Sequence, residues 1–280
     1  ALAAEKAADS AAKAAEAAAK VAEKAAPAPA VAPAAPAAPA AEAKKDEATW
    51  TSVVGLNFIS LYGNSRSITM NGTASIERKS ASWILGIKAA GAYGQANVSD
   101  TDEWQTVALN ASLQARGAFR FTQRYSAFLV GGIDTDHVAS IESRPYGEAG
   151  VGILWLDEKQ GDLSKLVLNT DVAFRVGYEF RHQYYPAPLT LDDELFVAPR
   201  VGLNFRYALT KDVVFTEEAE AMPTVIGETR VLVNSNTKIS ARIVAPLAIT
   251  LGLQVRYDSR PAPGKENTDV ALLAGLEATF

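Results

Sequence analysis

The sequence of 280 residues contains no cysteine, and its only histidines are His137 and His182. Without cysteine the chain can form neither disulfide bonds nor thiolate metal sites, which suits an oxidising envelope compartment. The sequence also lacks a glycine-rich phosphate loop, a zinc-ligand spacing and a dinucleotide fingerprint. The net charge of −5 gives no reason to expect nucleic acid as a partner. From these absences we predict no catalytic residue, no metal ligand and no cofactor.

Long apolar runs are missing as well. No uninterrupted apolar segment of about 18 residues occurs, so we expect no transmembrane helix. If the chain spans a membrane, it must do so as a closed β-barrel, because hydrocarbon cannot satisfy open backbone groups. The sequence starts at Ala1 and shows no basic stretch followed by an apolar core. This is typical of a mature protein whose signal peptide has been removed.

Alanine and charge repeat in heptads over residues 1–26. Alanine is the best helix former, and the pairs Asp9–Lys13 and Glu16–Lys20 have the acid-first order that stabilises a helix. We therefore predict an alanine-rich helix. It is either a marginal lone helix or one that associates with its own copies or with a periplasmic partner. The association seam would consist of Ala7, Ala11, Ala14, Ala18, Val21 and Ala25.

Proline interrupts this pattern in residues 27–48, which are rich in alanine and proline. Repeated proline prevents a helix and favours a semi-rigid polyproline-like linker. Helix and linker together would extend into the periplasm, where they could contact peptidoglycan. The remaining residues, 49–280, form the predicted main domain.

Residues 49–280 contain twelve candidate strands, most of which alternate between apolar and polar side chains. An even strand number with both chain ends on one side is typical of single-chain outer-membrane barrels. We predict an all-β transmembrane fold, a single antiparallel up-and-down barrel. The ninth candidate fits least well, because its acids fall on both faces and Pro223 removes a backbone donor. The candidates are 50–62, 66–78, 82–97, 103–118, 124–134, 144–156, 165–182, 194–209, 212–224, 229–244, 247–259 and 268–280.

Alternation alone does not say which face is buried; a soluble sandwich or lipocalin-like barrel would enclose the apolar face instead. The candidate strands are, however, much longer than the usual 5–6 residues of soluble strands. Most predicted inner turns are short, although the inner connection 157–164 is longer. The aromatic residues also form two groups, as expected at the two membrane interfaces. The inner group is Trp50, Trp83, Tyr125, Trp155, Phe205, Tyr207 and Phe280, and the outer group is Tyr62, Tyr93, Trp104, Tyr178, Phe180, Phe196 and Tyr257.

The polar face of the strands would then line the lumen. A twelve-stranded barrel has a wider interior than the eight-stranded kind that side chains fill. The lining is either a narrow pore with a cationic bias, which favours anions or acidic oligosaccharides, or a ladder of paired charges that blocks the lumen. The predicted lining residues are Lys88, Arg116, Asp171, Arg175, Glu179, Arg200, Arg206, Lys238, Arg242, Arg256 and Glu277.

The final strand alternates and ends in an aromatic residue at the carboxyl terminus. This pattern resembles the terminal signature of bacterial outer-membrane barrels, which the barrel assembly machinery reads. We predict that Val270, Leu272, Leu276 and Phe280 form this signal. The expected surroundings are outer-membrane lipids and lipopolysaccharide.

A family resemblance supports the same address. The turn Gly63-Asn64-Ser65 within VGLNFISLYGNSRSITMNG (54–72) resembles the salt-induced outer-membrane proteins, a Gram-negative barrel family without an assigned function. The stretches ARGAFRFTQRYSAFLVGGIDTD (115–136) and PYGEAGVGILWLDE (145–158) are similar to the pattern of that family. The resemblance implies a barrel fold and no catalytic residues. The alanine-rich helix and the linker are departures from it.

The sequence therefore predicts a non-enzymatic outer-membrane barrel, either a narrow passive pore or a structural protein of the envelope. The alternative is an assembly or tethering module, in which residues 1–48 form a homo-oligomer or bind peptidoglycan or a periplasmic protein. A lipid-modifying enzyme is the third hypothesis, because His137 and His182 fall in or beside outer loops. Such an enzyme would need a histidine–serine pair on the lipid-facing surface.

Overall fold

The computed structural model describes residues 48–61, 66–97, 104–160, 163–185, 188–262 and 265–280. The predicted N-terminal helix, its association seam and all but the last residue of the predicted linker lie outside these residues. Among the residues described, no helix has the length and apolar character needed to cross a bilayer.

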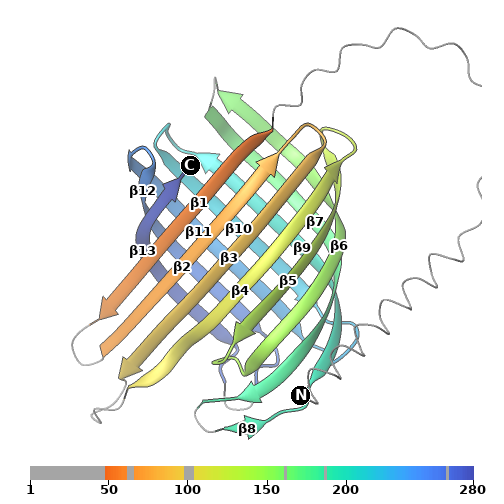
Figure 1. Cartoon of the computed structure of the whole chain (residues 1–280), viewed down its shortest axis with the longest axis vertical. Coiled ribbons are helices and arrows are strands. Elements are labelled where there is room, and N and C mark those ends of the chain that lie inside the picture. The colour runs from red at the N-terminus through yellow and green to blue at the C-terminus, as the bar shows by residue number, and fades with distance from the viewer. Residues whose placement is uncertain (1–47, 62–65, 98–103, 161–162, 186–187, 263–264) are drawn as a thin grey trace, which may run out of the picture. The chain divides into compact units, whose positions relative to one another are not determined.

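The described residues form thirteen strands, and twelve of them build a barrel (Figure 1). The short strand β8 pairs only with the end of β7, at His182 and Gln183. The strands are β1 (Thr49–Leu61), β2 (Arg66–Lys79), β3 (Trp83–Asn97), β4 (Gln105–Arg120), β5 (Tyr125–Asp136), β6 (Ile141–Gln160), β7 (Leu163–Gln183), β8 (Leu189–Thr190), β9 (Glu194–Ala208), β10 (Val213–Pro223), β11 (Val231–Val244), β12 (Leu247–Asp258) and β13 (Thr268–Thr279).

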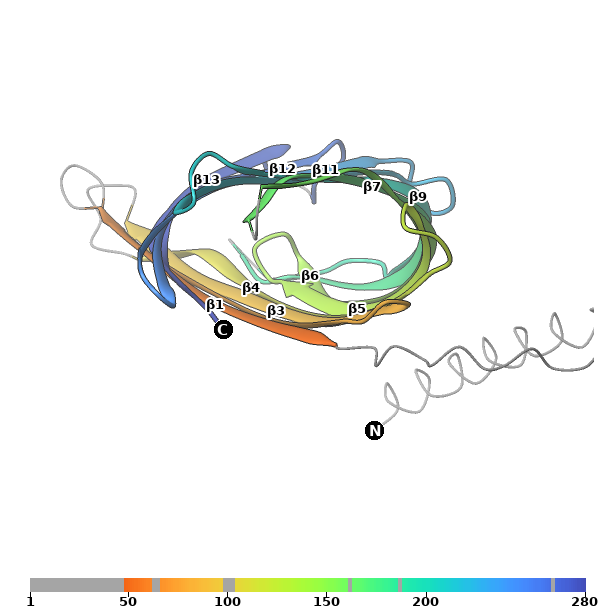
Figure 2. The same cartoon turned by 90° about the horizontal axis from the view of Figure 1, so that it is seen from above.

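Each barrel strand pairs antiparallel with its neighbours in the chain, and the first and last strands close the ring. The predicted closed antiparallel barrel of twelve strands is confirmed. Seen from above, it has an oval outline (Figure 2). The closing pair, β1 and β13, is short and joins only residues 53–57 to residues 275–279 among those described. We call the end with the short connections, such as 121–124 and 245–246, the inner end, and the opposite end the outer end.

Alternation along the strands divides the side chains between the two surfaces of the wall. On β7, Val172 is 46% exposed and Phe174 is 62% exposed, whereas the alternate residues Asp171 and Ala173, which face the interior, are only 2% and 3% exposed. Val172 lies opposite Val201 on β9, which also faces out. Because residues paired across two strands point to the same side, the apolar face of the whole ring is the outer face.

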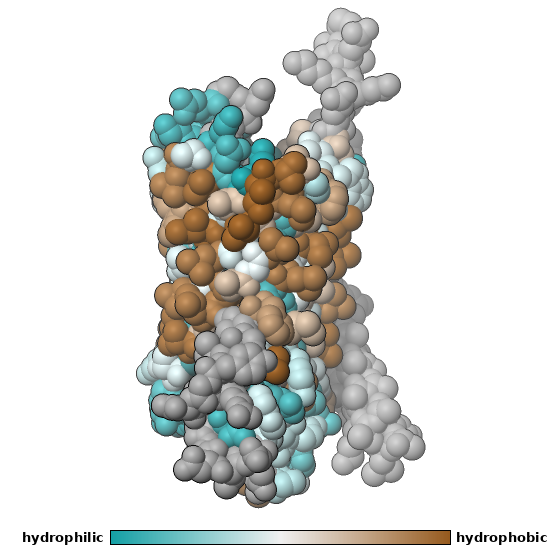
Figure 3. Space-filling model, turned by 90° about the vertical axis from the view of Figure 1, so that its left-hand side faces the viewer, coloured by the Kyte–Doolittle hydropathy of each residue, from teal (hydrophilic) through white to brown (hydrophobic). Residues whose placement is uncertain are grey.

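On the face shown in Figure 3, the outer surface is an apolar band between two more polar ends. Aromatic side chains mark both edges of this band: Trp50, Trp83 and Tyr125 are exposed at the inner edge, and Tyr93 and Tyr257 at the outer edge. This distribution matches the interfacial girdles of membrane barrels. The exposed aromatic groups include most members of the two predicted sets.

Phe196 corrects one of those assignments. It was expected in the outer girdle, but it is 4% exposed and packs inside the barrel against Ala198 and Met222. The reason is register: Phe196 has the same parity along β9 as the inward-facing Arg200.

Two charged side chains interrupt the outer surface of the described strands, one at the inner girdle and one within the apolar band. Arg78 pairs across the strands with Trp50 at the inner edge, and Glu217 pairs with Phe205 and Thr237 within the band. The acids of the ninth candidate strand, which is β10, therefore lie on both faces of the wall, as its sequence indicated. Glu218 and Glu220 face the interior and Glu217 faces out.

The β6–β7 hairpin differs from the predicted inner loop at 157–164. The last pairing of β5 with β6 is at Ile153, and the last pairing of β9 with β7 is at Leu166. Beyond these points β6 and β7 continue as a two-stranded ribbon, which projects past the neighbouring turns (Figure 1). The predicted loop is therefore mostly strand.

Candidate functional site

The interior of the barrel holds the candidate site, because that is where most charged side chains of the strands converge. The strand register places on the inner face all eleven residues that the sequence suggested for the lining: Lys88, Arg116, Asp171, Arg175, Glu179, Arg200, Arg206, Lys238, Arg242, Arg256 and Glu277. Their partners divide the interior into regions with different properties.

A dense ion-pair cluster lies against β4 and β7. The guanidinium of Arg116 donates two hydrogen bonds to the carboxylate of Asp171, at 2.8 and 3.3 Å. Arg116 also stacks over the ring of Phe128, 3.9 Å from its centroid. Because Asp171 is almost fully buried, this bidentate pair is what keeps its charge inside the wall.

The cluster continues through Glu148 on β6 and Glu220 on β10. Glu148 accepts hydrogen bonds from Arg175 at 2.9 Å and from Arg200 at 3.1 Å. Arg200 also donates to Glu220 at 2.6 Å, and Asn234 donates to the other oxygen of Glu220. Each buried carboxylate therefore meets at least one arginine. This matched arrangement fixes the side chains against the wall formed by β4–β7, β9 and β10.

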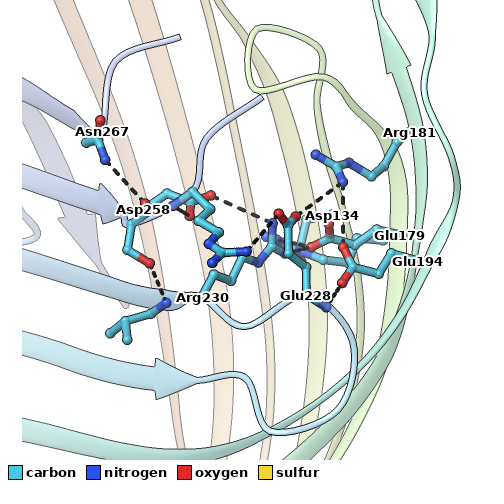
Figure 4. Close-up of polar contacts among 12 residues, drawn as sticks. Asp134, Glu179, Arg181, Glu194, Glu228, Arg230, Asp258 and Asn267 are labelled. Atoms are coloured by element: carbon cyan, nitrogen blue, oxygen red, sulfur yellow. Dashed lines mark hydrogen bonds and ion pairs between the residues drawn. The ribbon is translucent and has the colours of Figure 1, made fainter. Parts of the chain in front are cut away.

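A second network crosses the outer end of the lumen (Figure 4). Arg144 bridges Asp134, at 2.7 Å, and Glu179, at 3.1 Å. Glu179 also pairs with Arg230 from the β10–β11 connection. The pairing gathers β5, β6, β7 and an outer connection around one fully buried carboxylate.

The same outer network includes the connection 224–230 and the start of β9. Arg181 lies 3.6 Å from Glu194 and 3.9 Å from Glu228. Arg230 also approaches Asp258 at the end of β12. These contacts hold the outer connection against the mouth of the barrel (Figure 4).

Two ion pairs join opposite walls of the barrel, and we call them the cross-lumen pairs. Lys88 on β3 lies 3.6 Å from Glu218 on β10, and Arg256 on β12 lies 3.1 Å from Asp136 on β5. In each case the two strands are six places apart in the ring of twelve, so they face each other directly. The oval section brings these walls close together (Figure 2). The first pair lies toward the inner end and the second at the outer end.

The wall formed by β1, β2, β12 and β13 is different, because its inward side chains are mostly small and polar. They include Thr51, Asn57, Thr69, Asn71, Thr73, Ser75, Thr250, Gln254 and Gly275. Thr250 donates a hydrogen bond of 3.4 Å to Asn57, and Lys238 pairs with Glu277 beside them. This small polar wall therefore faces the charged wall across the lumen.

Three arginines that face the interior near the inner end have no ion-pair partner within the described part of the chain. They are Arg120 at the end of β4, Arg206 on β9 and Arg242 on β11. Arg206 donates instead to the backbone carbonyl of Ser164, at 2.6 Å. The inner mouth consequently carries uncompensated positive charge.

The predicted assembly residues lie on the outer surface of the last strand. Val270, Leu272, Leu276 and Phe280 are between 52% and 71% exposed. Phe280 also exchanges two backbone hydrogen bonds with Ser52 on β1, at 2.8 and 2.9 Å. The terminal residue thus extends the short closing pair of the barrel.

The two histidines meet at the outer end around a single tyrosine. The ring of Tyr184 lies 4.4 Å from that of His137 and 4.7 Å from that of His182. Burial, and then the carboxylate of Glu142, raises the pKa of Tyr184 above its usual value. The cluster is an aromatic contact between outer connections.

Ser140 is the serine that the structure brings to these histidines. Its backbone contacts both, because its N–H donates to the His137 carbonyl and its carbonyl accepts from the His182 N–H. Its hydroxyl is fully buried, however, and has no hydrogen-bond partner among the described residues. A buried hydroxyl without a general base is not an activated nucleophile. Among the described residues there is also no cluster of side chains that could hold a metal ion.

Several residues of the interior were missed by the sequence reasoning, notably Glu148, Glu220 and Arg144. Glu148 and Arg144 have the same parity along β6, so alternation within that strand would have found them. Glu220 was hidden by the irregular pattern of its strand, where adjacent acids occupy both faces.

The closed ring, the apolar outer band and the charged interior define an outer-membrane-type β-barrel. Residues 54–280 match the family described as "Protein of unknown function, DUF481". The chain belongs to this family. No functionally curated protein matches the sequence.

Solved structures similar to this chain are outer-membrane barrels at low sequence identity. The KdgM porin in complex with disordered oligogalacturonate is 10% identical, with a TM-score of 0.42, over 82% of this chain and 99% of that one. The NanC porin is 9% identical, with a TM-score of 0.46 and the same coverage. The COG4313 outer membrane channel from Pseudomonas putida F1 is 11% identical, with a TM-score of 0.48, over 85% of this chain and 97% of that one.

Proposed function

We propose that the chain is a non-enzymatic protein that forms a narrow passive pore. The observation that carries this proposal is the division of the interior into a charged wall and a small polar wall. The small side chains leave room for water along β1, β2, β12 and β13. The side chains of Lys88 and Glu218, which reach across toward the inner end, are 62% and 55% exposed. A pair as exposed as this one stands in an open lumen, where it narrows the passage without sealing it.

The charge pattern favours anions. Most lumenal acids are paired, whereas Arg120, Arg206 and Arg242 at the inner mouth have no acidic partner among the described residues. Uncompensated positive charge beside a narrow passage attracts anions and repels cations. Small anions and acidic oligosaccharides are therefore the proposed solutes.

The test is conductance of the purified full chain in planar bilayers. We expect discrete single-channel steps and a reversal potential that indicates anion preference in a salt gradient. Protein that inserts into the bilayer but gives no steps over a wide voltage range would mean that the paired charges block the lumen.

The proposed location is the bacterial outer membrane. The exposed apolar band requires hydrocarbon around it, and lipids and lipopolysaccharide are the expected surroundings. The barrel assembly machinery would read the terminal strand through Phe280 and its outward neighbours. The narrower relationship to salt-induced outer-membrane proteins is proposed on the sequence resemblance alone.

A second candidate function is tethering through residues 1–48. Its support is topological: β1 begins at Thr49, opposite Lys79, at the same end of the barrel as the short turns. By the usual orientation of such barrels, this end faces the periplasm, so the N-terminal extension would start there. Deleting residues 1–48 should then reduce the number of chains per oligomer or weaken the envelope, while single-channel conductance stays unchanged. If neither changes, the tethering function is wrong.

A further inference from the structure

The outward face of β1–β4 contains a groove at the inner edge of the apolar band. It has a volume of about 380 Å³ and is lined by Trp50, Ile76, Arg78, Leu85, Ile87 and Gly117 among others. All of these side chains except that of Arg78 are apolar or absent. A solvent-filled groove of this composition would be unfavourable, so its chemistry indicates an apolar occupant.

The groove runs from the edge of the band into its interior. Trp50, Arg78, Leu85 and Gly117 form one row across four neighbouring strands. Trp50 and Arg78 lie next to the inner ends of β1 and β2, whereas Gly117 lies three residues before the end of β4. The row therefore begins at the interface and ends deeper in the band.

Gly117 creates much of the hollow. The outward neighbours in its row are large, but Gly117 presents no side chain beside Leu85. A Cβ at this position would meet only the Leu85 Cδ2 atom, at 3.7 Å, which is an ordinary contact. The space is thus not required by the backbone and could be filled by a larger side chain.

Arg78 supplies the charge at the entrance. It forms no ion pair with any described residue, although its neighbour Lys79 pairs with Glu77 inside the barrel at 2.8 Å. At the membrane interface the guanidinium of Arg78 is suited to a lipid headgroup, because its planar set of donors matches the geometry of a phosphate. At this depth the phosphates available are those of the inner leaflet.

The size of the groove fits one hydrocarbon chain. If each methylene takes about the volume of a water molecule, roughly 30 Å³, the groove holds about a dozen of them. That is enough for most of one acyl chain of a phospholipid. Arg78 lies at the rim and the apolar part of the groove lies behind it. A phospholipid has the same arrangement, with its charged headgroup at the interface and its acyl chain deeper in the membrane.

We propose that this groove is a binding site for one glycerophospholipid of the inner leaflet, with its phosphate on Arg78 and one acyl chain along Leu85 and Gly117. The site rests on the proposed membrane location but is independent of conduction. A chain that conducts without retaining lipid would contradict only this site. A chain that retains lipid without conducting would contradict only the pore.

The experiment counts lipids on the full chain by native mass spectrometry in mild detergent. The probes are a phosphatidylglycerol, a diacylglycerol with the same chains but no phosphate, and lipid A. We expect one phosphatidylglycerol per chain and much weaker retention of the other two. Equal retention of the diacylglycerol would refute phosphate recognition, and preferred retention of lipid A would refute an inner-leaflet phospholipid.

Two variants test the two halves of the site separately. Arg78→Gln should weaken phosphatidylglycerol retention about tenfold, the loss expected for one charge-assisted contact. Gly117→Leu should abolish retention by filling the groove. The matched controls are Lys79→Gln, which faces the lumen, and Gly147→Leu, an outward glycine on β6 with nothing within 4 Å of its added Cβ. If Gly117→Leu and Gly147→Leu retain equal amounts of lipid, the site does not exist.

Discussion

Lys88 and Glu218 lie 3.6 Å apart, although their strands stand on opposite sides of the barrel. The pair places one cation and one anion in the open lumen toward its inner end. Because the pair spans the passage from one wall to the other, it is expected to control the width of the pore.

Removing either partner should widen the pore. We expect Lys88→Ala and Glu218→Ala each to raise single-channel conductance by about a factor of two, because the side chain no longer crosses the passage. The exchange variant Lys88→Glu with Glu218→Lys restores the pair and should return conductance to the original value. Unchanged conductance in both alanine variants would show that ions take a path elsewhere.

The buried pair of Arg116 and Asp171 should matter for stability rather than for conductance. Asp171→Asn leaves the Arg116 guanidinium inside the wall without its carboxylate. Breaking a buried pair costs about 3–5 kcal/mol, but Arg116 is partly exposed and keeps its contact with Phe128, so we expect a loss of about 2 kcal/mol. Urea-induced unfolding in lipid vesicles measures this loss.

The control for that experiment is Glu218→Gln, which removes an exposed charge from the lumen. Exposed pairs contribute little, so its free energy of unfolding should stay close to that of the original chain. If Asp171→Asn were as stable as this control, the ion-pair cluster would not be holding the wall together.

The unpaired arginines of the inner mouth should set the ion preference. A unit charge about 7 Å from a passing ion in water changes the energy of that ion by roughly 0.6 kcal/mol, with opposite signs for an anion and a cation, so the ratio of their permeabilities changes by a factor of about seven. We therefore expect Arg206→Gln and Arg242→Gln each to reduce the chloride-to-potassium permeability ratio by about this factor. Reversal potentials in a potassium chloride gradient give the ratio. Arg78→Gln, on the outer surface, should leave it unchanged.

Glu217 should reduce the stability of the barrel in lipid. It lies in the apolar band, where Ser235 donates a hydrogen bond to it at 2.6 Å and Thr237 donates another. Acidic residues on the lipid face destabilise barrels, although less than basic ones. Glu217→Gln keeps acceptor and donor atoms near both hydroxyls, so we expect it to raise the free energy of unfolding by about 1 kcal/mol. A decrease would mean that the charge itself is required there.

The terminal aromatic residue should affect assembly more than the folded barrel. Deleting Phe280 removes its two backbone hydrogen bonds with Ser52 and the exposed ring at the inner edge. We expect much less protein in the outer membrane of cells and a smaller effect on refolding in detergent. Phe280→Trp keeps an aromatic end and should assemble normally. Equal membrane levels after the deletion would show that Phe280 is not part of the assembly signal.

Most of the fold could be predicted from the sequence because the period of two is long and regular. The strand from Leu163 to Gln183 alternates over almost its whole length, so its inward residues Asp171, Arg175 and Glu179 were evident. The projecting part of the β6–β7 hairpin was not evident, because the segment LDEKQGDLSK carries no alternation and its strand residues pair only across their own hairpin. The two-residue β8 was too short to leave a pattern.

The contacts inside the lumen could not be predicted from the sequence, for a different reason. Parity tells which side of the wall a residue faces, but not which residue it meets across the interior. That depends on how the ring closes and how flat the barrel is. The pairing of Arg256 with Asp136, 120 residues apart in the chain, follows from both. The groove beside Gly117 likewise needs four strands in register before it appears.

The short closing pair between β1 and β13 has a consequence for how the wall opens. In the described part of the chain, five paired positions and the contact of Phe280 with Ser52 join these strands, whereas thirteen paired positions join β1 to β2 on its other side. Fewer shared backbone hydrogen bonds make this line the least costly place to part the cylinder sideways. Amide protons along Val53–Asn57 should therefore exchange with deuterium before those of the wall that carries the ion-pair cluster. Any solute that left the lumen sideways into the bilayer would pass between β1 and β13.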